Sequence, residues 1–184
     1  MLIGCHGSVW TGRFDKDGLR TAVEGTAKAG FGLVELPIFD PDSWDVALTR
    51  TLLADHGIVA TGSLGLTDEI NISSEDTRVV AQGEEHLRKV VDILHTLGST
   101  HLVGVIYGPM KKHMRPATPL ELRHGQEALG RLSEYAADAG VTLGTEVVNR
   151  YETNIINTAK HALDYLDRVP GGRVGLQGLG KVVS

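Results

Sequence analysis

Two carboxylates lie close together in the segment T-E-V-V-N-R-Y-E, which spans residues 145–152. A short, mainly apolar run begins at Val141 and ends on Glu146, and Arg150 and a second carboxylate, Glu152, follow it. A carboxylate where a buried strand opens into a loop is unfavourable without a partner, and that partner is usually a metal ion or a reacting substrate. The segment therefore indicates a catalytic or metal-binding site. The alternative is a glutamate paired with Arg150 in a surface loop.

The sequence lacks the motifs of several other enzyme classes. Neither H-E-x-x-H nor a cysteine pair occurs, so no zinc pattern is present. The G-x-S-x-G elbow of acyl transfer, the P-loop and a G-x-G-x-x-G after the first expected strand are also missing. The sequence is compatible with an oxygen-rich Mn²⁺ or Mg²⁺ site that includes Glu146, although one carboxylate cannot form such a site alone.

Composition narrows the class of protein. The 184 residues are 41% hydrophobic and 22% charged, which is typical of a globular domain with a core. The net charge of −5 argues against nucleic acid or an anionic membrane as the partner. A single cysteine, Cys5, excludes an internal disulfide and favours the cytoplasm. We expect no signal peptide, and no apolar run approaches the roughly 20 residues that span a bilayer.

The chain repeats a short apolar run, a polar loop and an amphipathic stretch that glycine closes. We expect strands at residues 2–8, 32–38, 58–66, 101–107, 141–147 and 173–176. We expect helices at residues 19–29, from 42 or 43 to 56, from 73–76 to 97, 119–139, and from 155 or 158 to 168. Glycines mark four of the helix ends, at Gly30, Gly57, Gly98 and Gly140. Ser73 and Asp76 have the spacing of a capping box.

Strands that alternate with helices predict a parallel sheet in one α/β domain, residues 1–184. A doubly wound sheet and a (β/α)8 TIM barrel both fit this pattern, and the missing glycine fingerprint favours the barrel. A complete barrel takes about 250 residues. We therefore expect an incomplete barrel of about five βα units and a possible sixth strand, lacking the C-terminal strands.

Barrel chemistry is found where the strands end, and the expected strand ends carry polar and aromatic residues. Such a lining suits a small polyhydroxylated ligand, because apolar walls face ring carbons and polar groups face hydroxyls. Four of these residues also have purely structural explanations. His6 could be a buried, hydrogen-bonded histidine, and Trp10 and Phe14 could cap the core. Glu35 could pair with a neighbouring base. Ser63 and Tyr107 also fall at strand ends.

The stretch from Glu146 to Glu152, with Asn157 and Thr158 after it, resembles the ketose 3-epimerases. These are the D-tagatose and D-psicose 3-epimerases of the xylose-isomerase-like barrel superfamily. The resemblance covers about residues 1–170. Further stretches that look like this family are Gly4 with Ser8 and Trp10, residues 30–35, and residues 71–76.

The resemblance implies that Glu146 is a metal ligand and the acid/base group, and that Glu152 contacts the substrate. It implies epimerisation of a ketose at C3 through an enediolate, a cofactor of Mn²⁺ (or Mg²⁺ or Co²⁺), and a homo-oligomer. The family takes its other metal ligands from an Asp, a His and a Glu on later strands. No Asp or Glu follows Asp167 in this chain, so we expect weak or absent metal binding and no activity from it alone.

Two alternatives stay open at this point. One is a non-catalytic, truncated barrel fragment. The other is a different member of the superfamily, such as an inosose dehydratase-like or hydroxypyruvate isomerase-like protein.

Overall fold

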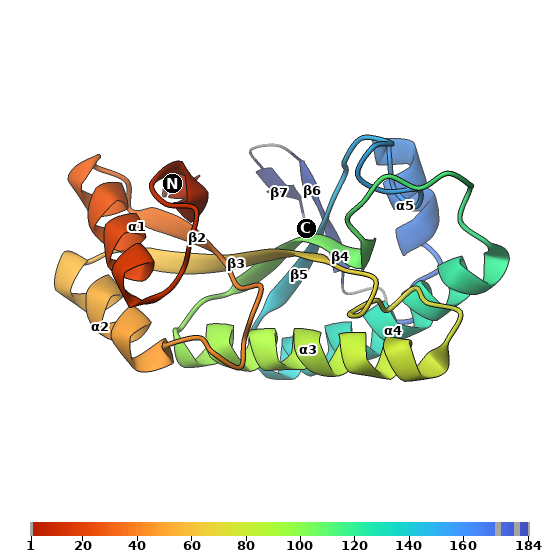
Figure 1. The fold of residues 1–184 in the computed structure, drawn as a ribbon, viewed down its shortest axis with the longest axis horizontal. Coiled ribbons are helices and arrows are strands. Elements are labelled where there is room, and N and C mark those ends of the chain that lie inside the picture. Colours follow the sequence, from red (N-terminus) through yellow and green to blue (C-terminus); the bar gives the residue numbers. More distant parts are fainter. Residues whose placement is uncertain (1, 172–173, 179–180, 184) are drawn as a thin grey trace.

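The computed structural model describes residues 2–171, 174–178 and 181–183, in which strands and helices alternate (Figure 1). The strands are β1 (Gly4–His6), β2 (Leu33–Pro37), β3 (Val59–Leu66), β4 (His101–Pro109), β5 (Thr142–Glu146), β6 (Val174–Gly178) and β7 (Lys181–Val183). The helices are η1 (Gly7–Val9, a 3₁₀ turn), α1 (Lys16–Lys28), α2 (Val46–His56), α3 (Thr77–Thr96), α4 (Pro119–Asp138) and α5 (Ala159–Leu166).

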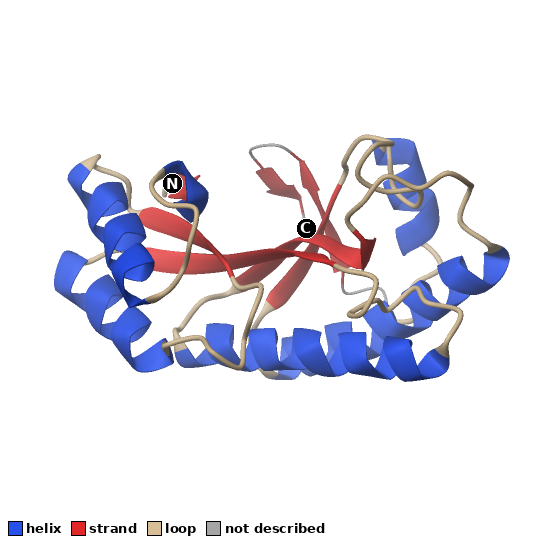
Figure 2. Cartoon of the chain, viewed as in Figure 1, coloured by secondary structure: helices blue, strands red, loops and turns tan. Residues whose placement is uncertain are grey.

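The sheet has the strand order of a TIM barrel. Strands β1 to β6 are neighbours in chain order and all pair in parallel, while β7 pairs antiparallel with β6. A doubly wound sheet would reverse its order at a switch point, and this sheet does not. The α-helices cover one side of the sheet, from α1 and α2 at one end to α5 at the other (Figure 2). The prediction of a barrel-type α/β fold with five βα units and a sixth strand is confirmed.

Strand boundaries differ most at the two ends of the chain. The first strand is shorter than predicted, because the chain turns into η1 at Gly7. The sixth strand begins at Val174 and continues to Gly178, beyond the predicted end at Leu176. The predicted first residue of that strand, Arg173, lies outside the described residues. Strand β7 was not predicted.

The ends of the helices were predicted from the sequence more accurately than their starts. All four predicted glycines adopt the left-handed conformation, with φ of 84°, 63°, 69° and 72° in chain order. The predicted cap of α2 at Asp42 or Ser43 is wrong, because the Asp45 carboxylate accepts from Leu48 N at 3.0 Å. The predicted capping box at Ser73 and Asp76 is also wrong, because Asp76 alone caps α3.

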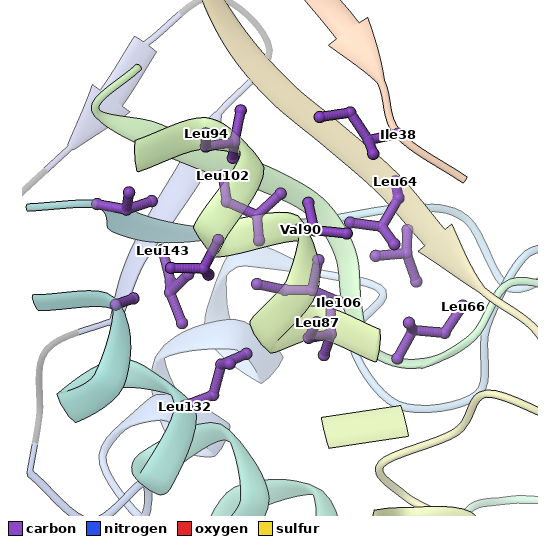
Figure 3. Close-up of a cluster of buried hydrophobic side chains, with 14 of the residues drawn as sticks. Ile38, Leu64, Leu66, Leu87, Val90, Leu94, Leu102, Ile106, Leu132 and Leu143 are labelled. Atoms are coloured by element: carbon purple, nitrogen blue, oxygen red, sulfur yellow. The ribbon is translucent and has the colours of Figure 1, made fainter. Parts of the chain in front are cut away.

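The core lies between the sheet and helices α3 and α4 (Figure 3). Leu87, Val90 and Leu94 follow the spacing of one helix face and are all fully buried. They pack against Leu102 and Ile106 of β4, which are also fully buried. Each such side chain contributes about 1.5–3 kcal/mol through removal from water. This packing makes the sheet a fixed platform for the residues on its other face.

Helices α3 and α4 are also joined by a cluster of charges around Glu84. The Glu84 side chain is only 13% exposed, and its two carboxylate oxygens accept from Arg88 and Arg131, each at 2.8 Å. Burial opposes ionisation of this carboxyl, but the hydrogen bonds from Arg131 and Arg88 outweigh it. The pKa of Glu84 therefore lies below its ordinary value of 4.5.

We expect Glu84→Gln to lower the free energy of unfolding by about 1–3 kcal/mol at pH 7, because two guanidinium groups lose their charged acceptor. A lowered folded-state pKa stabilises the fold above the unfolded value, and this contribution disappears as the pH falls through the folded pKa. Urea unfolding at pH 7 and pH 3 should therefore show a smaller difference at the lower pH. Glu85→Gln is the control, because that side chain is 72% exposed. A difference that persists unchanged at pH 3 would contradict this account.

Candidate active site

Glu146, Glu35, His6 and Ser63 lie on the face of the sheet away from the helices. Successive side chains of a strand point to opposite faces. Leu143 of β5, Val34 and Leu36 of β2 and Leu64 of β3 belong to the core beneath the helices, so the residues one or three positions away face the other side. On β1, Cys5 Sγ lies 3.4 Å from Thr26 Oγ1 of α1, so its neighbour His6 faces away from α1. This shared face is the one that lines the inside of a barrel.

The His6 side chain, on β1, lies close to side chains of β2 and β3. Its Nδ1 accepts from Ser8 N at 3.1 Å, so the neutral ring carries its hydrogen on Nε2. That Nε2 lies 3.3 Å from Ser63 Oγ and 3.7 Å from Glu35 Oε1. The three side chains, from the end of β1 and from within β2 and β3, thus place one N–H donor and one carboxylate acceptor side by side. A hydroxyl of a ligand could engage both.

Glu146 is the last residue of β5 and is half-buried. Burial raises the pKa of its carboxyl, and the negative charges of Glu35 and Glu152 raise it further, while His6 opposes the shift. A carboxyl with a raised pKa is a stronger base once ionised. The arrangement therefore suits removal of a proton from a bound ligand.

The surroundings of Glu146 also fit a divalent cation. Besides burial, which is the largest cause, the charges that raise its pKa are those of two carboxylates, and a bound cation would offset their repulsion. Carboxylate oxygens are the ligands that Mn²⁺ and Mg²⁺ prefer. Within the described ranges, however, no three His, Cys, Asp or Glu side chains come together as a metal-binding group. Glu146 can supply one ligand of such a site, and the others must come from elsewhere.

Glu152 is fixed by the turn that follows β5. Its N–H donates to Asn149 O at 3.0 Å, and its carboxylate accepts from the Asn149 side-chain amide. Asn149 Oδ1 in turn accepts from Tyr151 N at 2.8 Å. Arg150 is exposed and forms no ion pair with either glutamate in the described part of the chain. The alternative of a structural salt bridge between Glu146 and Arg150 is therefore wrong.

The two predicted aromatic walls have different positions. The Trp10 indole N–H donates to Thr26 Oγ1 at 3.0 Å, and its ring packs so closely on Gly25 that a Cβ there would lie 2.7 Å away. The structure thus brings Trp10 against α1 and not together with His6. Phe14 lies beside Gly7, at the turn that follows His6.

Phe14 also forms part of a groove between the loops after β1 and β2. Its ring stacks on Trp44 with centroids 6.1 Å apart. The groove has a volume of about 840 Å³ and is lined by Pro37 and Phe39 as well. His6, Glu35 and Glu146 are not among its lining residues. The groove is therefore separate from Glu35 and Glu146.

Among the described residues, no helix is both long enough and apolar enough to cross a membrane.

Comparison with known proteins connects this geometry to a family. The family model of the xylose isomerase-like TIM barrel matches residues 23–177. A ketose 3-epimerase of Arthrobacter globiformis is 50% identical over 176 residues, which cover 96% of this chain and 61% of that protein. An L-ribulose 3-epimerase of Methylomonas sp. (strain DH-1) is 43% identical over 166 residues, covering 90% of this chain and 58% of that protein.

Solved structures agree with the sequence comparison. The crystal structure of D-allulose 3-epimerase from Methylomonas sp. in complex with D-allulose matches with a TM-score of 0.91 and 41% identity. The match covers 95% of this chain and 62% of that one. The chain thus spans about three-fifths of the length of these relatives. The chain belongs to the xylose isomerase-like TIM barrel family, and the relatives that it resembles within that family are ketose 3-epimerases.

Proposed function

We propose that this chain is part of an enzyme that epimerises a ketose at C3, with Glu146 as the acid/base group. The observation that carries the proposal is the position of Glu146: it is half-buried at the end of β5, with a raised pKa and with Glu35 and Glu152 nearby. The names of the relatives supply the reaction and the class of substrate.

In this proposal each residue acts on a different part of the sugar. The Glu146 carboxylate removes the proton from C3, and an enediolate forms between that carbon and the adjacent carbonyl carbon. His6 Nε2–H donates to a hydroxyl of the sugar, and the Glu35 and Glu152 carboxylates accept from others. A second group on the opposite face of the sugar returns a proton and so inverts C3. We propose that this second group comes from the later strands of the complete barrel.

Glu146 would also hold a divalent cation, for which we propose Mn²⁺, with Mg²⁺ or Co²⁺ as alternatives. When bound, such an ion stabilises the negative charge that develops on the oxygens of the ketose. One carboxylate with water ligands cannot hold the ion in a fixed geometry. We therefore propose that residues 1–184 alone bind the ion weakly.

Several further features belong to the proposal. Phe14 acts as an apolar wall of the substrate site from its place beside Gly7, whereas Trp10, which packs on Gly25 of α1, is not part of that wall. Residues 1–184 form one domain with the start of a barrel. The enzyme acts in the cytoplasm as a homo-oligomer, with a sugar and neither nucleic acid nor a membrane as its partner.

The test is a chimera in which residues 1–177 are followed by the remaining part of the Arthrobacter globiformis ketose 3-epimerase, which is 50% identical over the matched region. We expect it to exchange the C3 hydrogen of D-fructose, D-tagatose or D-psicose for deuterium in D₂O, as followed by NMR. The 184-residue chain should show no exchange, because it supplies only one proposed metal ligand. Exchange by the short chain, or a folded chimera without exchange, would contradict the proposal.

A further inference from the structure

We propose that Tyr107 is a positioning residue, whose hydroxyl clamps the two ends of the loop between β5 and α5 and so fixes Glu146 relative to Glu152. This inference deepens the proposed function and rests on it for the roles of the two glutamates. The clamp itself is a structural claim that can be tested without any activity.

The clamp consists of one hydroxyl and two main-chain carbonyls. Tyr107 Oη donates to Glu146 O at 2.9 Å and lies 3.4 Å from Ile156 O. A phenol has one hydrogen, so Glu146 O, the nearer carbonyl, is the main acceptor. Glu146 opens the loop after β5, and Ile156 lies three residues before α5. One side chain thus holds both ends of the segment that carries Glu152.

The Tyr107 hydroxyl bonds to β5 just beyond the last residue pair of β4 and β5. The register of β4 with β5 ends at the pair Gly104 and Thr145, one residue before Glu146. Glu146 continues to pair with β6, through Gln177. On the β4 side, its carbonyl is held by the Tyr107 hydroxyl. Because a partly buried carbonyl that loses its donor costs free energy, this contact constrains the main chain at the catalytic residue.

Tyr107 is itself held from several sides. It is fully buried, and burial raises the pKa of its hydroxyl, which therefore stays protonated and able to donate. Its main-chain carbonyl accepts from the buried Ser73 hydroxyl, which comes from the loop before α3. Its ring lies 6.2 Å from that of Tyr165 in α5. The side chain that forms the clamp is thus held in the core.

The loop behaves as one piece between the two clamped ends. Asn157 Nδ2 donates to Val148 O at 3.1 Å and to Thr153 O at 3.0 Å, which closes the loop on itself. The turn from Asn149 to Glu152 lies inside this closed loop. Movement at either end would therefore displace Glu152 together with its turn, and the distance between the two carboxylates depends on the clamp.

Tyr165 offers a matched control in the same cluster. Its ring is 5% exposed and packs against Tyr107, and its hydroxyl is buried. That hydroxyl lies beside the Ser73 side chain and makes no hydrogen bond to the loop between β5 and α5. Tyr165→Phe therefore removes a buried tyrosine hydroxyl next to the clamp without removing a bond to the loop.

The experiment is amide hydrogen exchange, measured by NMR on the 184-residue chain under native conditions. In Tyr107→Phe, the amides of Glu152 and Thr153 should exchange at least about tenfold faster, because the loop opens locally. The amides of Val90 and Leu94 in α3 should change by less than about twofold, and Tyr165→Phe should leave all four within about twofold. Acceleration in α3 equal to that in the loop, or no acceleration at all, would overturn the inference.

A second measurement applies if Tyr107→Phe fails to fold. In the unsubstituted chain, the Tyr107 hydroxyl proton should give a slowly exchanging resonance with cross-relaxation to the α protons of Glu146 and Ile156. The absence of that resonance would overturn the inference.

A kinetic measurement separates the clamp from the proposed reaction. In the chimera, Tyr107→Phe should lower kcat by about ten- to a hundredfold, since small displacements of a catalytic group have effects of this size. Tyr165→Phe should leave kcat within about twofold. An unchanged kcat in Tyr107→Phe would refute a positioning role. If the unsubstituted chimera shows no exchange at C3, the proposed function fails, and the amide exchange still decides whether the clamp exists.

Discussion

Replacing Glu146 with Gln in the chimera is expected to abolish exchange of the C3 hydrogen, a loss of at least about 10²–10⁴-fold in turnover. The amide has nearly the same shape as the carboxylate, but it cannot accept the C3 proton and is a poorer ligand for a divalent cation. The measurement is deuterium incorporation at C3 in D₂O, followed by NMR, with the unsubstituted chimera beside it.

We expect the Glu146→Gln variant to stay folded, so that a loss of exchange reports on the chemistry. In the folded chain, burial and the charges of Glu35 and Glu152 raise the pKa of Glu146. A carboxyl whose pKa is raised on folding destabilises the folded state at pH values above its unfolded-state pKa. A neutral Gln at position 146 removes that penalty, so the variant should unfold at the same or a higher urea concentration.

Glu152→Gln is the matched control, because it changes the other carboxylate of the same loop. It should mainly raise KM, because Glu152 contacts the substrate in the proposed mechanism and does not remove the proton. Exchange at C3 that survives Glu146→Gln would refute the assignment of the acid/base group. So would an equal loss of kcat in Glu152→Gln.

The order of the elements could be predicted from the sequence because each unit carries its own local signal. Apolar runs mark the strands, and the four glycines that end helices mark positions where the chain needs a left-handed residue. Helix starts were harder, because Asp42, Ser43 and Asp45 are all good caps within four residues. The local sequence does not distinguish the three, and the helix packs mainly against α1, which the local sequence does not contain.

Contacts between distant residues could not be predicted in the same way. Ser73 has the sequence context of a helix cap, yet its hydroxyl donates to Tyr107, 34 residues further on. Trp10 looks like part of the mouth, yet its indole N–H bonds to Thr26 of α1. The position of Glu146 at the end of β5 could be read from the apolar run that it ends. Its raised pKa depends on burial and then on Glu35, more than a hundred residues away, and no local pattern contains that information.

Gly104→Ala is expected to lower the free energy of unfolding by about 2–6 kcal/mol. Gly104 adopts φ of 122°, which L residues rarely do, and a Cβ there would lie 2.3 Å from Leu64 O on the neighbouring strand. Backbone strain contributes about 1–3 kcal/mol, and overpacking a similar amount. The measurement is urea unfolding followed by circular dichroism.

The control for this prediction is Gly12→Ala. Gly12 has no positive φ, and a Cβ there would meet nothing within 4 Å. That variant should stay within about 0.5 kcal/mol of the unsubstituted chain. Because Gly104 pairs with Leu64 and lies three residues before Tyr107, the strain falls on the strand that carries the clamp on Glu146. If Gly104→Ala and Gly12→Ala unfold at the same urea concentration, β4 can relax at Gly104, and the tight pairing of β3 with β4 does not hold Tyr107 in place.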